Sequence, residues 1–296
     1  MIEAITIQKS AQPQRTLKKE VHFSGIGIHT GRLVSIRFVP AAAGKGIVFK
    51  RVDLPGQPEI PALVEYAAET ARSTSIGLDS IRIHTVEHVL AAIHANRIHN
   101  LTIELTNIEP PVGNGSSDVF VEMIEQAGIE ELDSPEFCLS VQQPIYHSEK
   151  DIHVVALPGS GFKVSYTLDY PETPAIKSQY RSFDITAESF KKEIASCRTF
   201  ALYEEVATLM DRGLIKGGSL DNAVMIKGDA IFSKGGLFFP DEMVRHKILD
   251  LIGDLTLVGY PINAHIIAIR SGHAANVALA KKLIGSLREV QSGISR

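Results

Sequence analysis

The sequence predicts a mixed α/β protein of two domains. Its 296 residues are enough for two ordinary domains with a core each. Each half of the chain ends as a strand, a glycine-containing turn and a helix, first at residues 101–127 and again at 264–285. An acidic, proline-bearing segment at 130–136 separates the halves and has few large apolar residues. We place the domain boundary there, which gives domains 1–134 and 135–296.

Charge, apolar runs and cysteine content exclude several classes of protein. The formal net charge of −4 offers no basic surface for phosphates, so we expect no nucleic-acid partner. Apolar runs such as 264–269 are too short to cross a bilayer, so we expect no stable membrane insertion. The start of the chain lacks a basic stretch followed by an apolar core, so we expect no secretory signal. Only Cys138 and Cys197 are present, which favours the reducing cytoplasm over a disulfide-based fold.

The spacing of apolar residues predicts the order of strands and helices. Alternation predicts strands in the first half at 21–23, 34–39 and 101–105. One helix is expected to start near Thr85, which we assign as its N-cap, and another to follow the turn at 113–117 and end at Gly128. In the second half we expect strands at 139–145, 152–157, 162–168 and 264–270, and helices at 186–196, 203–212, 241–258 and from 273.

The helix at 241–258 carries a polar stripe with metal-ligand spacing. At about 100° per residue, His246, Asp250 and Asp254 fall one turn apart, roughly opposite an apolar cluster that includes Val244 and Leu251. The spacing of four residues lets His246 and Asp250 bind one ion from a single helical face. An ordinary solvated face is the alternative, and it is the commoner explanation of a single pair. The stripe nevertheless lacks the long Glu/Lys pairs of a merely wet surface.

Glu87 and His88 stand in the first turn of the helix that follows Thr85. Neighbouring side chains on a helix point about 100° apart, so one of the two can bind an ion while the other reaches the water that the ion activates. This arrangement supplies a ligand and a general base. The alternative is a glutamate favoured by the helix dipole beside an incidental histidine.

Three further residues are candidates for acid catalysis and for stabilising negative charge. His273 follows Ser271-Gly272 where a strand meets a helix, a common position for sites in α/β proteins. A helix N-terminus disfavours a positive imidazole, so a general acid there needs a carboxylate such as Asp254; the alternative is a histidine that caps the helix. Thr199 and Lys247 can each stabilise an oxyanion, although neither signal is specific.

The segments that contain these residues resemble one known family in their order. They resemble the UDP-3-O-acyl-N-acetylglucosamine deacetylases, bacterial zinc amidases that catalyse the committed step of lipid A synthesis. The resemblance covers nearly the whole chain, from residues 23–31 to the final helix. The segments that carry it are Thr85-Val86-Glu87-His88, Ser196-Cys197-Arg198-Thr199-Phe200, Gly217-Gly218-Ser219, residues 244–255 and Ser271-Gly272-His273-Ala274.

The resemblance implies a zinc hydrolase that acts on an acetamide. It implies Zn²⁺ bound by His88, His246 and Asp250, with Glu87 as general base and His273 as general acid. Activated water would attack the N-acetyl carbonyl of the acylated UDP-N-acetylglucosamine, and the products would be acetate and a free amine. One group must accept a proton and the other must donate one, so we expect a bell-shaped pH profile.

The resemblance also implies supporting residues and a fold. Asp254 would orient and charge His273, while Thr199 and Lys247 would assist the oxyanion. The implied fold is α+β, with two α/β two-layer domains, each a sheet covered by helices, and with helices packed between the domains. An insert near residues 201–229 would form an apolar passage for the acyl chain, lined by Phe200, Leu202, Val206, Ile215 and Leu220.

Two other functions compete with this hypothesis. A zinc peptidase would normally carry both histidines in one HExxH helix, and the chain has no such motif. A non-catalytic binding protein with structural zinc would normally use four protein ligands and several cysteines. We therefore expect a cytoplasmic deacetylase whose partner is its substrate, with no obligate protein partner implied.

Overall fold

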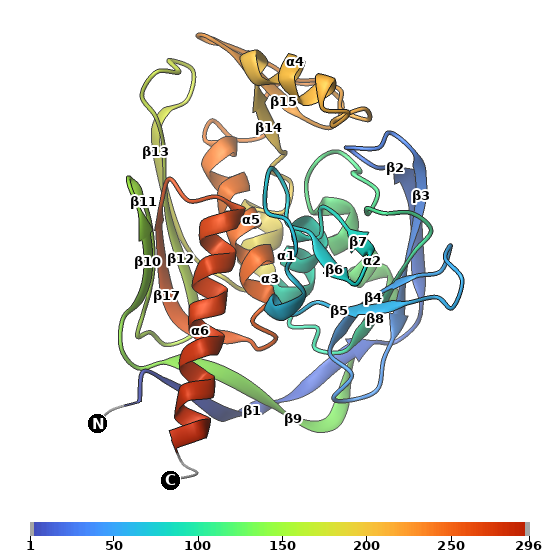
Figure 1. Cartoon of the computed structure of the whole chain (residues 1–296), viewed down its shortest axis with the longest axis vertical. Helices are drawn as coiled ribbons and strands as arrows, with labels where there is room; N and C mark the ends of the chain where they lie inside the picture. Colours follow the sequence, from blue (N-terminus) through green and yellow to red (C-terminus); the bar gives the residue numbers. More distant parts are fainter. Residues whose placement is uncertain (1–2, 294–296) are drawn as a thin grey trace.

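Two sheets stand on opposite sides of the molecule with helices packed between them (Figure 1). The structure is a computed structural model that describes the backbone of residues 3–293 and the side chains of residues 3–287. Apolar side chains from both sheets and from the helices between them form one connected core. The α+β class with a helical layer between the sheets is confirmed.

The larger sheet has seven strands and is built around β17 (Ile262–Ile269). β17 pairs antiparallel with β11 (Ile152–Leu157) and parallel with β12 (Phe162–Tyr170), and its first two residues pair with β9 (Ile129–Val141). The outer strands are β10 (Ile145–Glu149) on β11, β13 (Lys177–Asp184) on β12 and β1 (Ile5–Leu17) on β9. Every second residue of β17 is buried, as the alternating pattern predicted.

The smaller sheet has five strands, all from the first half of the chain. Its central strand, β8 (Leu101–Leu105), pairs antiparallel with β3 and parallel with β4. The strands, in sheet order, are β2 (Val21–Ile26), β3 (Leu33–Pro40), β8, β4 (Ile47–Arg51) and β5 (Glu59–Pro61). The short elements between this sheet and the helices are the 3-10 helix η1 (Val64–Tyr66) and the hairpin β6 (Ile76–Leu78) and β7 (Ile81–Ile83).

Two helices at the centre of the molecule carry most of the candidate site. All residues of α5 (Glu242–Thr256) except Lys247 are buried, and all residues of α1 (Glu87–Ala95) except His94 are buried. The remaining helices between the sheets are α2 (Asp118–Ala127), α3 (Ala187–Glu193) and α6 (His273–Gly293). The polar stripe of α5 therefore lies inside the protein, and the solvated-face alternative is wrong.

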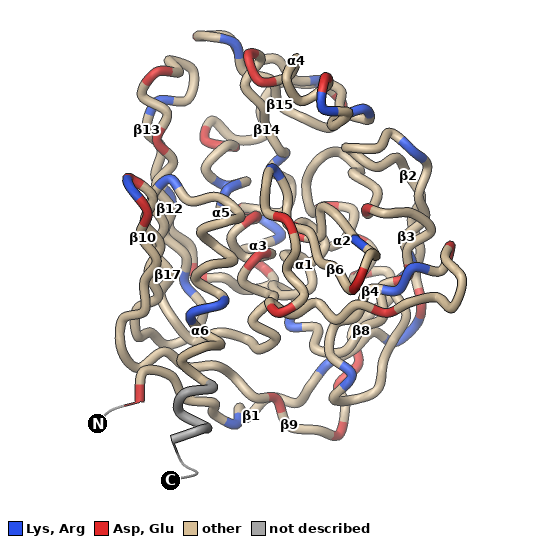
Figure 2. The backbone as a smooth tube through the Cα atoms, in the orientation of Figure 1, with Lys and Arg blue, Asp and Glu red and all other residues tan. Residues whose placement is uncertain are grey.

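The predicted insert at 201–229 forms a separate small layer at one end of the molecule, at the top of Figure 1. It contains α4 (Tyr203–Asp211) and, with its flanking residues, the three-stranded sheet β14 (Phe200–Leu202), β15 (Val224–Lys227) and β16 (Ala230–Phe232). Basic and acidic residues alternate along this layer (Figure 2). No helix in the described part of the chain combines the length and apolar character that a bilayer crossing needs.

Two local expectations are wrong, and the segment at the expected domain boundary is a strand. Thr85 does not cap α1: Val86 is the N-cap residue, and Thr85 has the left-handed φ of 57°, with its hydroxyl unpaired among the described residues. The expected strand at 139–145 is the end of β9 and the start of β10, separated by a turn. Residues 130–136 are not irregular but lie within β9, because β1 supplies a partner strand. The division into two domains near this point remains a prediction.

Candidate metal centre

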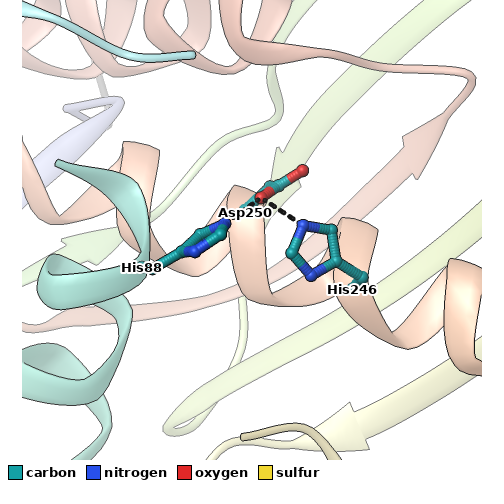
Figure 3. Close-up of side chains that lie close together, drawn as sticks. All are labelled: His88, His246 and Asp250. Atoms are coloured by element: carbon teal, nitrogen blue, oxygen red, sulfur yellow. Dashed lines mark ion pairs between the residues drawn. The ribbon is translucent and has the colours of Figure 1, made fainter. Parts of the chain in front are cut away.

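Three ligand-type side chains converge where α1 and α5 cross. The Oδ1 atom of Asp250 lies 3.6 Å from Nε2 of His88 and 3.3 Å from Nε2 of His246 (Figure 3). The two imidazole rings are perpendicular, with centroids 5.0 Å apart. All three residues are buried, and their ligand atoms lie within 4.8 Å of one another. Two nitrogens and one oxygen thus face a common point.

The chemistry of these three residues fits a divalent cation. Within the part of the chain that the structure describes, Oδ1 of Asp250 is buried without a hydrogen-bond partner. Burial alone would raise the pKa of Asp250, but His246 and Lys247 hold it well below its ordinary value, so the carboxylate is ionised. Burial lowers the pKa of His88, which favours the neutral imidazole that binds metals. Two histidines and one carboxylate, with no cysteine, form a zinc-type donor set with room for a further ligand.

A hydrogen bond from the second ring nitrogen of His246 fixes the orientation of its ring. Its Nδ1 atom lies 2.9 Å from the carbonyl oxygen of Cys197. A carbonyl can only accept a hydrogen bond, so Nδ1 is the donor, and Nε2, which faces Asp250, is the ring nitrogen left to bind an ion. The site therefore selects the tautomer that can bind an ion.

Glu87 and His273 also lie close to Asp250. The three residues form a second group whose ligand-type atoms all lie within 4.8 Å of one another. Oε2 of Glu87 accepts the backbone N–H of Thr74 at 3.0 Å, and Oε1 lies 4.0 Å from Nε2 of His273. Burial raises the pKa of Glu87 to about 8, although His273 opposes the shift. A carboxyl group with a pKa in this range is suited to taking and releasing a proton near neutral pH.

Asp254 holds His273 in its charged form. Nδ1 of His273 lies 2.9 Å from Oδ2 of Asp254, and both side chains are buried. Burial alone would lower the pKa of His273, but the attraction of Asp254, with a smaller contribution from Glu87, raises it to about 9. Asp254 also accepts the Thr74 hydroxyl and the side-chain amide of Asn276. His273 is therefore a charged donor at neutral pH, at the first residue of α6.

A glycine allows α1 to approach α5 closely enough for this arrangement. A Cβ atom at Gly253 would lie 2.0 Å from the backbone carbonyl oxygen of Glu87, far inside van der Waals contact. Gly253 precedes Asp254 and follows Asp250 by three residues. The close approach therefore occurs in the helical turn between Asp250 and Asp254, the carboxylate that pairs with His273.

Lys247 and Thr199 border the same space. Nζ of Lys247 donates to Oδ2 of Asp250 at 2.8 Å; burial opposes the ammonium, but Asp250 outweighs it and the pKa of Lys247 is raised. The N–H of Thr199 donates to the carbonyl of Gly115, and its carbonyl accepts the N–H of Val224, each at 2.8 Å. The side chain of Lys247 and the backbone of Thr199 are therefore held in the wall that also contains His88, His246 and Asp250.

Two cavities meet at this site. A polar cavity of about 320 Å³ is lined by Glu87, His88, His246, Lys247, Asp250 and His273. A second cavity of about 310 Å³ extends beneath the insert. Both cavities include Glu87, His88, Thr199 and Phe200 in their walls, so they adjoin at the candidate metal centre.

Comparison with known proteins assigns the family. The family model described as LpxC, UDP-3-O-acyl N-acetylglycosamine deacetylase, matches residues 14–285. The chain belongs to this deacetylase family. Proteins named UDP-3-O-acyl-N-acetylglucosamine deacetylase from Chlamydia felis and Chlamydia pneumoniae are each 50% identical to it over 275 residues, which cover 93% of this chain and 98% of theirs. The protein of that name from Chlamydia muridarum is 48% identical over 278 residues, 94% of this chain and 97% of its own.

We expected five residues to line an acyl passage, and four of them line the second cavity. They are Phe200, Val206, Ile215 and Leu220. Leu202 lines the polar cavity instead, together with Phe200. It is the last residue of β14 and the N-cap residue of α4, so the chain turns between it and Val206. Apolar wall residues that the sequence did not single out are Ile28, Leu209, Met210, Val224 and Met225.

The sequence also did not single out two residues that bond to Glu87 and Asp254. Thr74 bonds to Glu87 through its backbone and to Asp254 through its hydroxyl. Asn276 donates to Asp254 at 2.8 Å. Asn276 follows His273 by three residues in α6, a spacing that could have indicated a shared partner. Thr74 lies in an irregular segment, and no pattern in the sequence indicated it.

Proposed function

We propose that this protein hydrolyses the N-acetyl group of a UDP-3-O-acyl-N-acetylglucosamine in lipid A biosynthesis, with a zinc ion bound by His88, His246 and Asp250. The observation that carries the proposal is the unpaired, buried Oδ1 of Asp250, which faces two imidazole nitrogens beside Glu87 and His273. A zinc ion there would act as a Lewis acid on water and on the amide carbonyl.

Glu87 is the proposed general base. Its carboxyl borders the polar cavity and is held by the N–H of Thr74, so it can accept the proton of the attacking water without moving. Burial disfavours its ionised form and His273 favours it; a cation held by the neighbouring ligand group would favour the ionised form further.

His273 is the proposed general acid. It is held in its charged form by Asp254, its Nε2 lies 4.0 Å from Oε1 of Glu87, and both residues line the polar cavity. When the C–N bond of the amide breaks, this imidazolium donates its proton to the nitrogen that leaves as an amine. Base and acid therefore come from different helices, α1 and α6, and border one cavity.

Lys247 and Thr199 are the proposed stabilisers of the oxyanion. The Lys247 ammonium is held by Asp250, the Thr199 hydroxyl belongs to a residue of the same cavity wall, and both can stabilise developing negative charge. The apolar cavity beneath the insert receives the 3-O-acyl chain, since its walls are mainly apolar and it adjoins the centre. Both described cysteines are free, which agrees with a reaction in the cytoplasm.

The test is acetate release from an acylated UDP-N-acetylglucosamine. We expect the zinc-loaded protein to release acetate, a chelator to abolish the activity, and added zinc to restore it. No release by the zinc-loaded protein would favour a binding protein, and hydrolysis of peptides instead would favour a peptidase. Activity that is unaffected by complete removal of the metal would contradict the zinc assignment.

A further inference from the structure

The Cys197–Arg198 peptide is held at both ends by two side chains of α5. The Cys197 carbonyl accepts the bond from Nδ1 of His246 at 2.9 Å. The N–H of Arg198, which belongs to the same planar peptide unit, donates to Oε1 of Glu242 at 2.9 Å. Glu242 and His246 are four residues apart on α5, so they lie on one face of the helix.

Glu242 is itself held without freedom to rotate. It is fully buried, and Oε1 also accepts Nε of Arg198 at 2.8 Å. Its Oε2 atom accepts Nη2 of Arg198 at 3.1 Å and the backbone N–H of Phe238 at 2.8 Å. Four donors from two segments therefore fix the carboxylate, and through it the plane of the Cys197–Arg198 peptide.

From this arrangement we infer that Glu242 is a positioning residue for the metal ligand His246, acting through the Cys197–Arg198 peptide. The inference rests on the proposed metal centre. Its physical basis is that the partner of the second ring nitrogen of a ligating histidine orients the ring and affects metal affinity. A carbonyl can perform this task only when its own peptide plane is fixed, and Glu242 fixes it from the opposite end.

A neighbouring ion pair provides a matched control. Asp241, the N-cap residue of α5, and Arg245, four residues later, are also buried and are joined at 2.9 Å. Arg245 also donates hydrogen bonds to Glu193, and Asp241 forms ion pairs with Arg245 and Arg181. Neither residue bonds to the Cys197–Arg198 peptide within the described chain. The loss of Asp241 therefore perturbs the start of the same helix without releasing that peptide.

The test separates the hydrogen bond from the buried charge. Removing only Glu242 would leave Arg198 as an uncompensated buried charge, whereas replacing both members of such a pair is far better tolerated. We therefore compare two charge-free double variants, Arg198→Met/Glu242→Met and Arg198→Met/Glu242→Gln. They differ in whether residue 242 retains an oxygen that can accept the N–H of residue 198.

The measurement is the zinc dissociation constant, obtained by competition with a chromophoric chelator, together with the visible spectrum of the cobalt-substituted protein. We expect the variant with Met at 242 to bind zinc about 10- to 100-fold more weakly and to show an altered cobalt spectrum. The variant with Gln at 242 and the Asp241→Asn control should both remain close to wild type. Thermal unfolding of the apo-proteins is recorded in parallel.

Three outcomes would overturn the inference. These are wild-type zinc affinity in both double variants, an equal weakening of zinc binding in both double variants, and a weakening by Asp241→Asn equal to that caused by Met at 242. Should Met at 242 prevent folding, leucine takes its place in the same comparison; weaker zinc binding than in Arg198→Met/Glu242→Gln supports the inference, and equal zinc binding contradicts it. Failure of the wild-type protein to bind zinc would instead contradict the proposed function.

Discussion

The two cavities that meet at Thr199 are built in opposite ways. Around the polar cavity, the helices α1, α5 and α6 present buried carboxylates and imidazoles whose positions are fixed by hydrogen bonds and by close helix packing. The cavity beneath the insert has mainly apolar walls. Backbone hydrogen bonds join the insert to the turn that follows β2: the N–H groups of Lys216 and Gly217 donate to the carbonyl oxygens of His29 and Ile28.

This difference indicates a division of tasks within one site. Polar groups in the low-dielectric centre act strongly and demand accurate placement, so changes there should reduce the turnover rate. Apolar walls contribute energy in proportion to the area they cover, so changes there should alter which acyl chain binds. Variants that alter only one cavity can test whether the two tasks are separable.

The largest effect is expected for Glu87→Gln. The amide keeps the size of the side chain but cannot accept a proton, so kcat should fall about 10²- to 10⁴-fold. Acetate release and zinc content are measured together. Glu205→Gln is the control, since Glu205 borders the same cavity but is half-exposed and paired with Arg72. A zinc-loaded Glu87→Gln protein with nearly normal turnover would exclude Glu87 as the base.

The next effect is expected for Asp254→Asn, which should move the alkaline limb of the pH profile. His273 is active when protonated, and Asp254 raises its pKa to about 9. Loss of the negative partner favours the neutral imidazole, so the limb should shift to lower pH by about 1 to 3 units. An unchanged alkaline limb in a rate profile of the zinc-loaded variant would show that another group is the acid.

The same pair also affects stability. The folded-state pKa of His273 lies above its unfolded value of about 6.5, so its charge stabilises the folded apo-protein fully below that pH. This contribution is lost as the pH rises through about 9. Denaturant unfolding across this range should show the loss in the wild type and a smaller one in Asp254→Asn.

Much of the fold and the shared face of His246, Asp250 and Asp254 could be predicted because both follow from local periodicity, whereas His88 was indicated as a ligand only by the family resemblance. The 3.6-residue repeat placed His246, Asp250 and Asp254 on one face of α5, and alternation located β8 and β17. Periodicity alone could not show whether that face of the helix is exposed to solvent or buried. The answer depends on α1, whose sequence position is more than 150 residues away.

The parts that could not be predicted depend on nonlocal partners. The contribution of Thr74 could not be predicted, because it depends on hydrogen bonds to Glu87 in α1 and to Asp254 in α5. Residues 130–136 have a composition typical of a boundary, but the distant β1 converts them into a strand. Leu202 has the apolar character of its neighbours, and only the turn into α4 directs it to the polar cavity. Composition and spacing do not contain this information.

A smaller effect is expected for Gly253→Ala, measured against Gly285→Ala. The new methyl at 253 would meet the Glu87 carbonyl and push α1 from α5, which should cost about 1 to 3 kcal/mol of stability and reduce kcat. At 285, in α6, a methyl would meet no atom within 4 Å, and alanine is the better helix former, so stability should rise by up to about 1 kcal/mol. Equal changes in both variants would show that the close approach is unimportant.

The smallest effect is expected for Val206→Phe, which should change chain preference without changing the chemistry. The larger ring takes space from the apolar cavity, and each buried methylene is worth about 0.8 kcal/mol. A long acyl chain that loses contact for two methylenes should therefore lose roughly fifteenfold in kcat/KM. A short-chain substrate should be unaffected, and its kcat should stay near the wild-type value. Leu202→Phe is the matched control, because Leu202 borders the polar cavity. If Val206→Phe lowered kcat equally for every chain length, the two cavities would not be separable and the insert would also position the reacting groups.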